Sequence, residues 1–219
     1  MKKLFAATIA AAALAIAGAG TAQASQLVQN AGFETGDFTS WSLSGNTSFT
    51  SVAAAPAPGY DGISVVSGDS LGNYSAYLGP VGSTGTLSQT LQTVAGTTYT
   101  LSFDLANEGF SPNSFLAIVN GGTILNISNV NPSVTNFTLG STTYHILDYN
   151  QYQQSFVATS ANTTLSFTYE QSPSYWVLDT VQLVGQAVPE PTTWAMMLVC
   201  FGAIGLGLRG SLRRKALTA

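Results

Sequence analysis

The carboxylate whose surroundings in the sequence point most clearly to chemistry is Asp179. Val177, Val181 and Leu183 lie at even spacings from it in an alternating segment, so the alternation predicts that Asp179 shares their inward face. An unpaired inward carboxylate costs on the order of several kcal/mol, and the body of the chain offers no Lys or Arg to pair with it. Ca²⁺ would satisfy this group because it takes carboxylate and carbonyl oxygens as ligands. Hydrogen bonds from backbone N–H groups near a strand end are the alternative.

Aromatic side chains are the second group that could bind a ligand, because sugars stack on exposed rings. Trp176 alternates to the face opposite Val177, which predicts that its ring is exposed. Two tyrosines earlier in the chain complete the set of carbohydrate-binding candidates, which is Trp176, Tyr149 and Tyr152.

Candidate catalytic groups are few. The chain has one histidine, His145, and one cysteine, Cys200, which lies in an apolar C-terminal segment. Two carboxylates suffice for glycoside hydrolysis, and Asp104, Glu108 and Glu170 could supply such a pair. We therefore predict a protein without catalytic residues, and a carbohydrate-active enzyme with paired carboxylates is the alternative.

The fixed positive charges are confined to the two ends of the chain, whereas all ten Asp and Glu residues lie between them. The body therefore cannot bind nucleic acid by neutralising phosphates, and it has no Arg or Lys to clamp a phosphorylated or carboxylated ligand. With Cys200 as the only cysteine, the body also has no disulfide and must be held by its core. The six positive residues are Lys2, Lys3, Arg209, Arg213, Arg214 and Lys215.

The first 24 residues have the order of a secretory signal peptide. Lys2 and Lys3 precede the apolar stretch Leu4–Ala19, and Ala22-Gln23-Ala24 is a small-x-small cleavage site. We expect signal peptidase to cut there, so that the mature chain begins near Ser25.

The last 33 residues, 187–219, combine a proline-rich hinge, an apolar segment and a basic end. Pro189 and Pro191 flank Glu190 and exclude a helix interior at that point. Trp194–Leu208 carries no charge and would span about 22 Å as a helix at roughly 1.5 Å per residue, which is short for a hydrocarbon core of about 30 Å. The basic end would stop translocation and leave the body outside the cytoplasm. This membrane stop comprises Arg209, Arg213, Arg214 and Lys215.

This order of parts closely resembles the PEP-CTERM sorting signal. The resemblance implies that a membrane exosortase recognises and cleaves the chain near Pro189-Glu190-Pro191, in bacteria that make an extracellular polysaccharide matrix.

Between these ends, short β-strands with alternating polarity alternate with turn residues. Thr98–Asn107, Thr163–Glu170 and Tyr175–Val184 are the clearest strands, and Asn120-Gly121-Gly122 is a tight hairpin signal. Residues 25–186 are therefore predicted to form one all-β domain, an antiparallel β-sandwich of jelly-roll type.

Several segments of the body, in order, resemble the galactose-binding-like jelly rolls of many carbohydrate-binding modules. This resemblance implies that Glu34, which follows Gly32-Phe33, shares a structural Ca²⁺ with Asp179. The segments are Leu27–Glu34, Thr39–Trp41, Leu87–Leu91, Tyr99–Phe103 and Trp176–Val181.

We therefore expect an exported, surface-sorted, non-enzymatic β-sandwich protein of the extracellular matrix that contacts polysaccharide. It would reach the cell surface through a precursor held in the inner membrane by a C-terminal helix. A structural surface protein without a specific ligand is a further alternative.

Overall fold

The computed structural model describes residues 25–54, 57–58, 64–67, 72–186, 197–202 and 204. Ser25–Gln186 forms one compact unit. Residues 197–202 and 204 are helical, and no helix within the described ranges is both long and apolar enough to cross a bilayer. The predicted signal peptide, the Pro189-Glu190-Pro191 hinge and the basic end from Arg209 to Lys215 lie outside the described residues.

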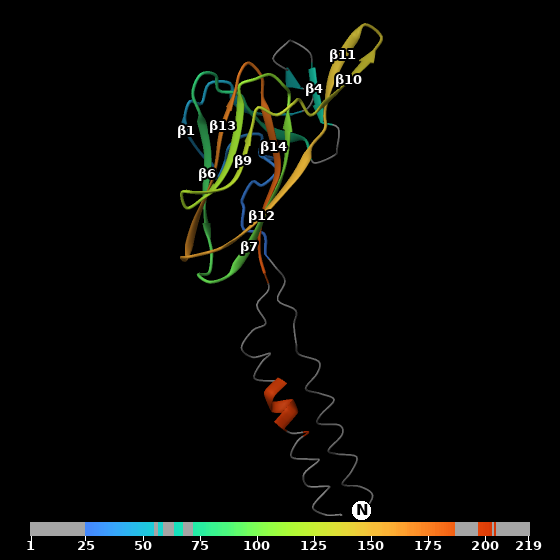
Figure 1. The fold of residues 1–219 in the computed structure, drawn as a ribbon. Helices are drawn as coiled ribbons and strands as arrows, with labels where there is room; N and C mark the ends of the chain where they lie inside the picture. The colour runs from blue at the N-terminus through green and yellow to red at the C-terminus, as the bar shows by residue number, and fades with distance from the viewer. Residues whose placement is uncertain are drawn as a thin grey trace, which may run out of the picture. The chain divides into compact units, whose positions relative to one another are not determined.

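Two five-stranded antiparallel sheets face each other across the core of this unit (Figure 1). The first sheet has the order β1-β6-β13-β8-β9 and the second has the order β12-β7-β14-β5-β2. The strands of the first sheet are β1 (Ser42–Gly45), β6 (Gly85–Gln92), β13 (Asn162–Gln171), β8 (Asn113–Val119) and β9 (Gly122–Ser128). Those of the second are β12 (Asn150–Val157), β7 (Thr98–Asn107), β14 (Trp176–Gly185), β5 (Tyr74–Leu78) and β2 (Thr50–Ala54).

A third, smaller sheet has the order β10-β11-β4-β3, in which β11 and β4 run parallel. Its strands are β10 (Val134–Leu139), β11 (Thr142–Leu147), β4 (Ser64–Ser67) and β3 (Ala57–Pro58). Figure 1 shows the β10–β11 hairpin extending beyond the two larger sheets.

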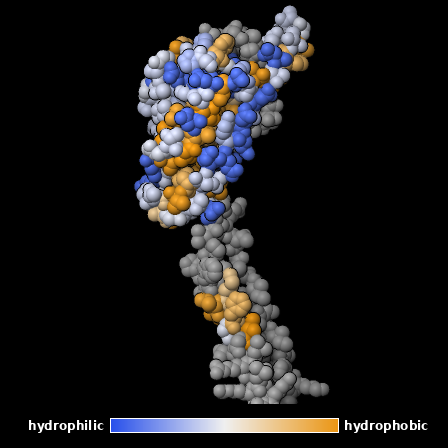
Figure 2. All heavy atoms as spheres, in the orientation of Figure 1, coloured by the Kyte–Doolittle hydropathy of each residue, from blue (hydrophilic) through white to orange (hydrophobic). Residues whose placement is uncertain are grey.

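The main core is formed by every second residue of the facing strands, as the alternation of a strand requires. Phe103 of β7 and Phe167 of β13 meet across the sandwich with their ring centroids 5.1 Å apart. Tyr99 closes this core near one end, where its ring stacks on Phe156. Figure 2 shows hydrophilic and hydrophobic side chains mixed over the face of the body that it presents.

A register shift in β14 changes which residues of that strand share a face, in contrast to the predicted alternation. Leu178 and Val181 both face the main core although they are three residues apart, because the pairing with β7 is irregular between Asp179 and Gln182. Thr180 has a φ of 49°, a left-handed conformation that is rare for a β-branched residue. The prediction that Asp179 shares a face with Val181 is therefore wrong.

Asp179 instead points to the outer face of the second sheet, where it is nevertheless buried at 1% exposure. It is buried because a smaller apolar cluster covers that face and includes the base of the β10–β11 hairpin. The buried members of this cluster are Tyr77, Ala106, Leu147 and Val177.

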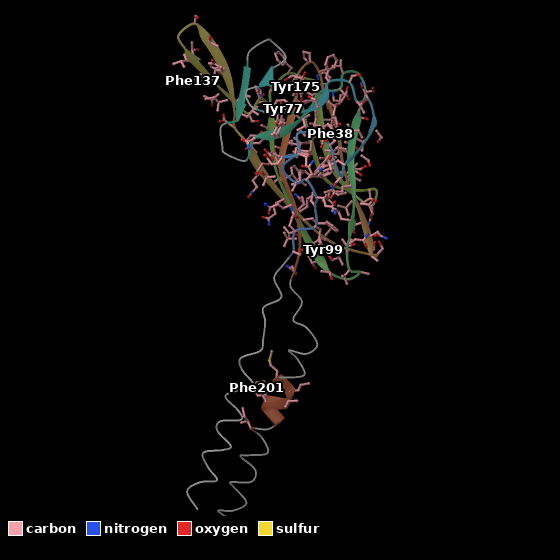
Figure 3. The ribbon with its side chains drawn as sticks, turned by 180° about the vertical axis from the view of Figure 1, so that it is seen from behind. Phe38, Tyr77, Tyr99, Phe137, Tyr175 and Phe201 are labelled. Carbon is pink, nitrogen blue, oxygen red and sulfur yellow. The ribbon has the colours of Figure 1, made fainter. Side chains whose placement is uncertain are left out.

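Several loops meet at one end of the sandwich, which we call the loop end. They are the connections 46–49, 79–84, 108–112 and 172–175. Backbone hydrogen bonds join them, from Gly79 N to Phe49 O (3.0 Å) and from Glu108 N to Tyr175 O (3.0 Å). Figure 3 labels Tyr77 and Tyr175 near this end and Tyr99 near the opposite one.

Candidate functional site

The carboxylate of Asp179 is held by two hydrogen-bond donors. Thr180 N donates to Oδ1 (2.6 Å) and Ser75 Oγ donates to Oδ2 (2.9 Å). Ser75 Oγ also lies 3.2 Å from the hydroxyl oxygen of Tyr149. Burial raises the pKa of Asp179 to about 7, because the two hydrogen bonds only partly offset desolvation, and the charges of Glu34 and Asp104 raise this pKa further.

Glu34 is held against the start of β5. Its Oε1 accepts hydrogen bonds from Asn73 N (2.9 Å) and Tyr74 N (3.2 Å). Gly72 has a φ of +142°, and a Cβ there would overlap Glu34 Oε1, so this close approach requires glycine. A Cβ on Gly32 would lie 3.4 Å from Asp179 Oδ1 and 4.0 Å from Glu34 Oε1. The two carboxylates therefore border the same small region beside Gly32.

This pair of carboxylates has the chemistry of a partial calcium site. Ca²⁺ prefers six to eight oxygen ligands, and each carboxylate offers about four lone-pair sites, so the hydrogen bonds already made leave acceptor capacity. Among the described residues, no three His, Cys, Asp or Glu side chains cluster as a metal site. The remaining ligands of a Ca²⁺ at Glu34 and Asp179 would therefore be backbone carbonyls and waters.

At the loop end, two phenylalanine rings are exposed to solvent. Phe49 is 65% exposed and Phe110 is 52% exposed, and Val81 on the connection 79–84 is 45% exposed. Both phenylalanines have left-handed backbones, with φ of 55° and 75°. Such conformations persist where the surroundings fix them: Gly79 N donates to Phe49 O, and Asn113 Nδ2 donates to Phe110 O (2.6 Å).

The same loops also hold buried and half-buried polar and aromatic groups. Tyr175 is half-buried and packs edge-on against Tyr77, with the ring centroids 5.9 Å apart. A Cβ on Gly79 would lie 2.7 Å from Tyr175 Cδ1, so glycine is needed for the ring to fit. Glu108 is buried and accepts a hydrogen bond from Ser174 Oγ (3.1 Å). Burial and the charge of Glu108 raise the pKa of Tyr175, which keeps this phenol neutral.

The three aromatic residues predicted to bind carbohydrate do not form one platform. Trp176 is 1% exposed, its ring packs against Phe115, and its Nε1 donates to Glu170 O, so the prediction that it is exposed is wrong. Tyr152 packs against the main core, where it stacks on Phe103 at 5.7 Å. Tyr149 packs against the smaller cluster on the opposite face of the second sheet.

The sequence reasoning missed Phe49 and Phe110. Each follows a run of turn-forming residues, Asn46-Thr47-Ser48 and Glu108-Gly109, and an aromatic residue inside such a run was the available signal.

Two of the three carboxylates considered for glycoside hydrolysis lie on different sheets. Asp104 lies between the core residues Phe103 and Leu105 and faces outward from the second sheet. Glu170 alternates with the buried Tyr169 and faces outward from the first sheet. Asp104 and Glu170 therefore lie on opposite outer faces and cannot act together on one bond.

Comparison with known families matches nearly the whole chain. Residues 21–184 match the model described as "Protein of unknown function (DUF642)". Residues 187–215 match the PEP-CTERM protein-sorting motif, which confirms the resemblance read from Pro189-Glu190-Pro191 and its flanks and marks the chain as exported through a membrane-passing precursor. No curated protein sequence matches the chain.

Comparison with solved structures shows the fold. TmCBM61 in complex with β-1,4-galactotriose has a TM-score of 0.50 and 18% identity, and the match covers 74% of this chain and 99% of that one. The CBM22-1 xylan-binding domain of Paenibacillus barcinonensis Xyn10C has a TM-score of 0.44 and 15% identity, over 75% and 97% of the two chains. The predicted jelly-roll sandwich of carbohydrate-binding-module type is confirmed.

Proposed function

This chain belongs to the DUF642 family, and we propose that it is a non-enzymatic carbohydrate-binding protein of an extracellular polysaccharide matrix. The fold that it shares with TmCBM61 supports this proposal, because that structure is a carbohydrate-binding module with a bound galactotriose. The PEP-CTERM motif supports the extracellular location.

The observation that carries the proposal is the pair of exposed rings at the loop end, Phe49 and Phe110. Sugars present flat apolar faces that stack on aromatic rings, while their hydroxyls need hydrogen-bonding groups nearby. The loop end supplies such groups: Asn46 Nδ2 lies 3.2 Å from Ser83 Oγ, within the same set of loops. The carbonyl oxygens of both phenylalanines accept hydrogen bonds, so the backbone that carries each ring would be positioned before a ligand arrives.

The charge of the body favours uncharged polysaccharides as ligands. No Lys or Arg lies between Leu4 and Leu208, so nothing there can pair with the carboxylate of a uronic acid. The many Asp and Glu residues would repel such a ligand at low salt. Because TmCBM61 was solved with β-1,4-galactotriose, β-1,4-galactan is the first neutral polysaccharide to test.

Both ends of the sandwich unit lie away from the loop end. Leu27 N donates to Leu183 O (3.0 Å) and Gln186 N donates to Thr98 O (2.9 Å), which places the first and last residues of the unit at the opposite end. The loop end is therefore left free for a ligand when the unit is tethered through its termini. Exosortase would then cut near Pro189-Glu190-Pro191, and the membrane stop would hold the precursor until cleavage.

A structural Ca²⁺ at Glu34 and Asp179 is part of the same proposal. It would join the first residues of the unit to β14 and would offset the cost of burying Asp179. When bound, Ca²⁺ would supply charge neutralisation and cross-linking rather than chemistry on a substrate.

Binding of the full-length chain, purified in mild detergent, to β-1,4-galactan and other neutral polysaccharides tests the proposal. We expect Phe49→Ala and Phe110→Ala to weaken binding about tenfold or more each, because stacking on an aromatic ring is lost. Val94→Ala is the matched control, since Val94 is 65% exposed on the connection between β6 and β7. Equal binding by all variants would contradict the loop-end site, and release of reducing sugar would contradict the non-enzymatic assignment.

A further inference from the structure

The β10–β11 hairpin presents an open strand edge. β10 pairs with β11 residue by residue, from Val134 opposite Leu147 to Leu139 opposite Thr142, without a register shift. β10 is the outermost strand of the small sheet, and no strand in the described part of the chain pairs with its other edge. Alternate N–H and C=O groups of β10 therefore point outward along that edge.

Apolar side chains accompany this edge. Every residue from Thr135 to Leu139 is exposed, with Phe137 at 47% and Leu139 at 66%. Because these two residues are two positions apart, they lie on the same face of the strand. Figure 3 labels Phe137 on the protruding hairpin, away from the two large sheets, and Figure 2 shows orange side chains on the hairpin.

The edge lacks the features that usually keep edge strands from pairing with other chains. Proteins protect such edges with Lys, Pro, inward charges or bulges. The segment from Val134 to Leu147 contains no Pro, Asp, Glu, Lys or Arg. By contrast, the pairing of β9, at the edge of the first sheet, shows a register shift at Ala117/Ile118, and β1, at its other edge, has four residues.

We propose that the free edge of β10 pairs antiparallel with the β10 edge of a second copy of this chain, so that the two small sheets become one continuous sheet. An antiparallel pair about a two-fold axis brings the same residues of both strands together. Phe137 and Leu139 of one copy then pack beside the same residues of the other, which covers both exposed side chains. Main-chain hydrogen bonds supply the rest of the contact, as in other strand-addition complexes.

Two features favour a second copy as the partner: the hairpin carries no Asp, Glu, Lys or Arg, and the sorting motif directs every copy to the same membrane. The sandwich unit carries nine of the ten acids, all except Glu190, and no Lys or Arg, so two bodies repel each other. The uncharged hairpin extends outward and lets two copies meet at a distance from most of these acids. The nearest acid in the sequence, Asp148, accepts a hydrogen bond from Thr135 Oγ1 (2.8 Å) at the hairpin base. The sorting motif gathers copies at one membrane, which raises their effective concentration.

Cysteine scanning on the full-length chain in membranes tests the strand pairing. Cys200 is first replaced by Ser, and single cysteines are then introduced by Asn136→Cys, Phe137→Cys, Thr138→Cys or Leu139→Cys. In an antiparallel pair about a two-fold axis, only the residue on the axis faces its own copy. Because a disulfide needs Cβ atoms about 3.5–4.5 Å apart, we expect a dimer-sized product at one of these positions only. Val94→Cys is the control on an equally exposed residue away from the hairpin.

Three outcomes of the scan would overturn the proposal. Absence of a dimer at all four hairpin positions would exclude strand pairing, and equal cross-linking at all positions and at Val94→Cys would indicate random collision. A cross-linked product with a different protein would show that the β10 edge pairs with that protein and not with a second copy.

Light scattering of the full-length chain in detergent measures the association directly. We expect Phe137→Asp to weaken dimerisation about tenfold or more, while Val94→Asp leaves it unchanged. Dimerisation should strengthen as salt rises, because salt screens the repulsion between the acidic bodies. A wild-type chain with one protomer per micelle at every concentration and salt level would overturn the proposal, and unchanged circular dichroism of Phe137→Asp would show that the hairpin variant is folded.

Discussion

Asp179 of β14 is the direct cross-strand partner of Asp104 of β7. Both carboxylates point to the outer face of the second sheet, where Asp179 is 1% and Asp104 is 8% exposed. Like charges placed directly opposite each other destabilise a sheet, and the sandwich unit carries no Lys or Arg to neutralise them. The fold therefore contains a buried acid that is costly to ionise.

This cost predicts that stability depends on pH. The pKa of Asp179 rises from the usual 3.8 to about 7 in the folded protein, so the folded state holds a proton that the unfolded state has released between those values. In the absence of Ca²⁺, the contribution of this proton is fully present below about pH 4 and is lost as pH rises through about 7. The free energy of unfolding should fall over that interval by up to roughly 1.4 kcal/mol per pH unit.

Chemical denaturation in EDTA at pH 5, 6, 7 and 8 measures this dependence. Other carboxylates also titrate near pH 4, so the comparison is with Asp179→Asn, which removes the proton-linked term and should flatten the curve. An identical pH profile for the two proteins would contradict the raised pKa.

Calcium should offset the loss of stability that we expect above pH 7. Ca²⁺ binds the ionised carboxylates, so adding it should raise the melting temperature at pH 8 more than at pH 5, and EDTA should abolish the gain. Glu34→Gln or Asp179→Asn should remove the response, whereas Asp37→Asn should retain it because Asp37 makes its hydrogen bonds with Thr35 and Thr39. Melting curves that are the same with and without EDTA would remove the calcium proposal.

Local alternation was enough to predict the sandwich, because core residues such as Phe103 and Phe167 recur at every second position of long strands. Alternation failed at β14, because the register shift near Thr180 depends on pairing with β7 and leaves no local signal. The exposure of Trp176 was mispredicted for a related reason. Before the register shift, the residues of β14 that face the main core are Trp176 and Leu178. Phe49 and Phe110 were missed because their exposure depends on loops that meet only in three dimensions.

The close contact of Gly72 with Glu34 predicts an unusually large cost for adding one methyl group. Gly72→Ala places a Cβ on Glu34 Oε1 and forces a φ of +142° on alanine, so we expect a loss of about 2–4 kcal/mol. Gly96→Ala is the matched control, because Gly96 has a φ of +83° and open space around its Cβ position. That variant should lose about 1–2 kcal/mol. Equal losses in urea unfolding would show that Glu34 does not occupy the position beside Gly72.

The burial of Trp176 separates a core role from a sugar-binding role. Trp176→Ala should destabilise the protein by about 3–5 kcal/mol, because it removes a fully buried ring that packs against Phe115. Intrinsic fluorescence during denaturation measures this loss, with Trp41 as a buried reporter. A variant that unfolds like the wild type but binds polysaccharide more weakly would show that Trp176 binds the ligand and is not a core residue.

Release of the protein from the membrane should depend on Pro189, Glu190 and Pro191. The PEP-CTERM match covers these residues, and the two prolines predict an extended segment, which is the form in which proteases bind their substrates. Replacing all three by Ala should leave the full-length form in the inner membrane, which immunoblots of membrane and medium fractions would show. Thr192→Ala with Thr193→Ala is the adjacent control and should be released normally. Normal release of the triple variant would mean that another signal directs processing.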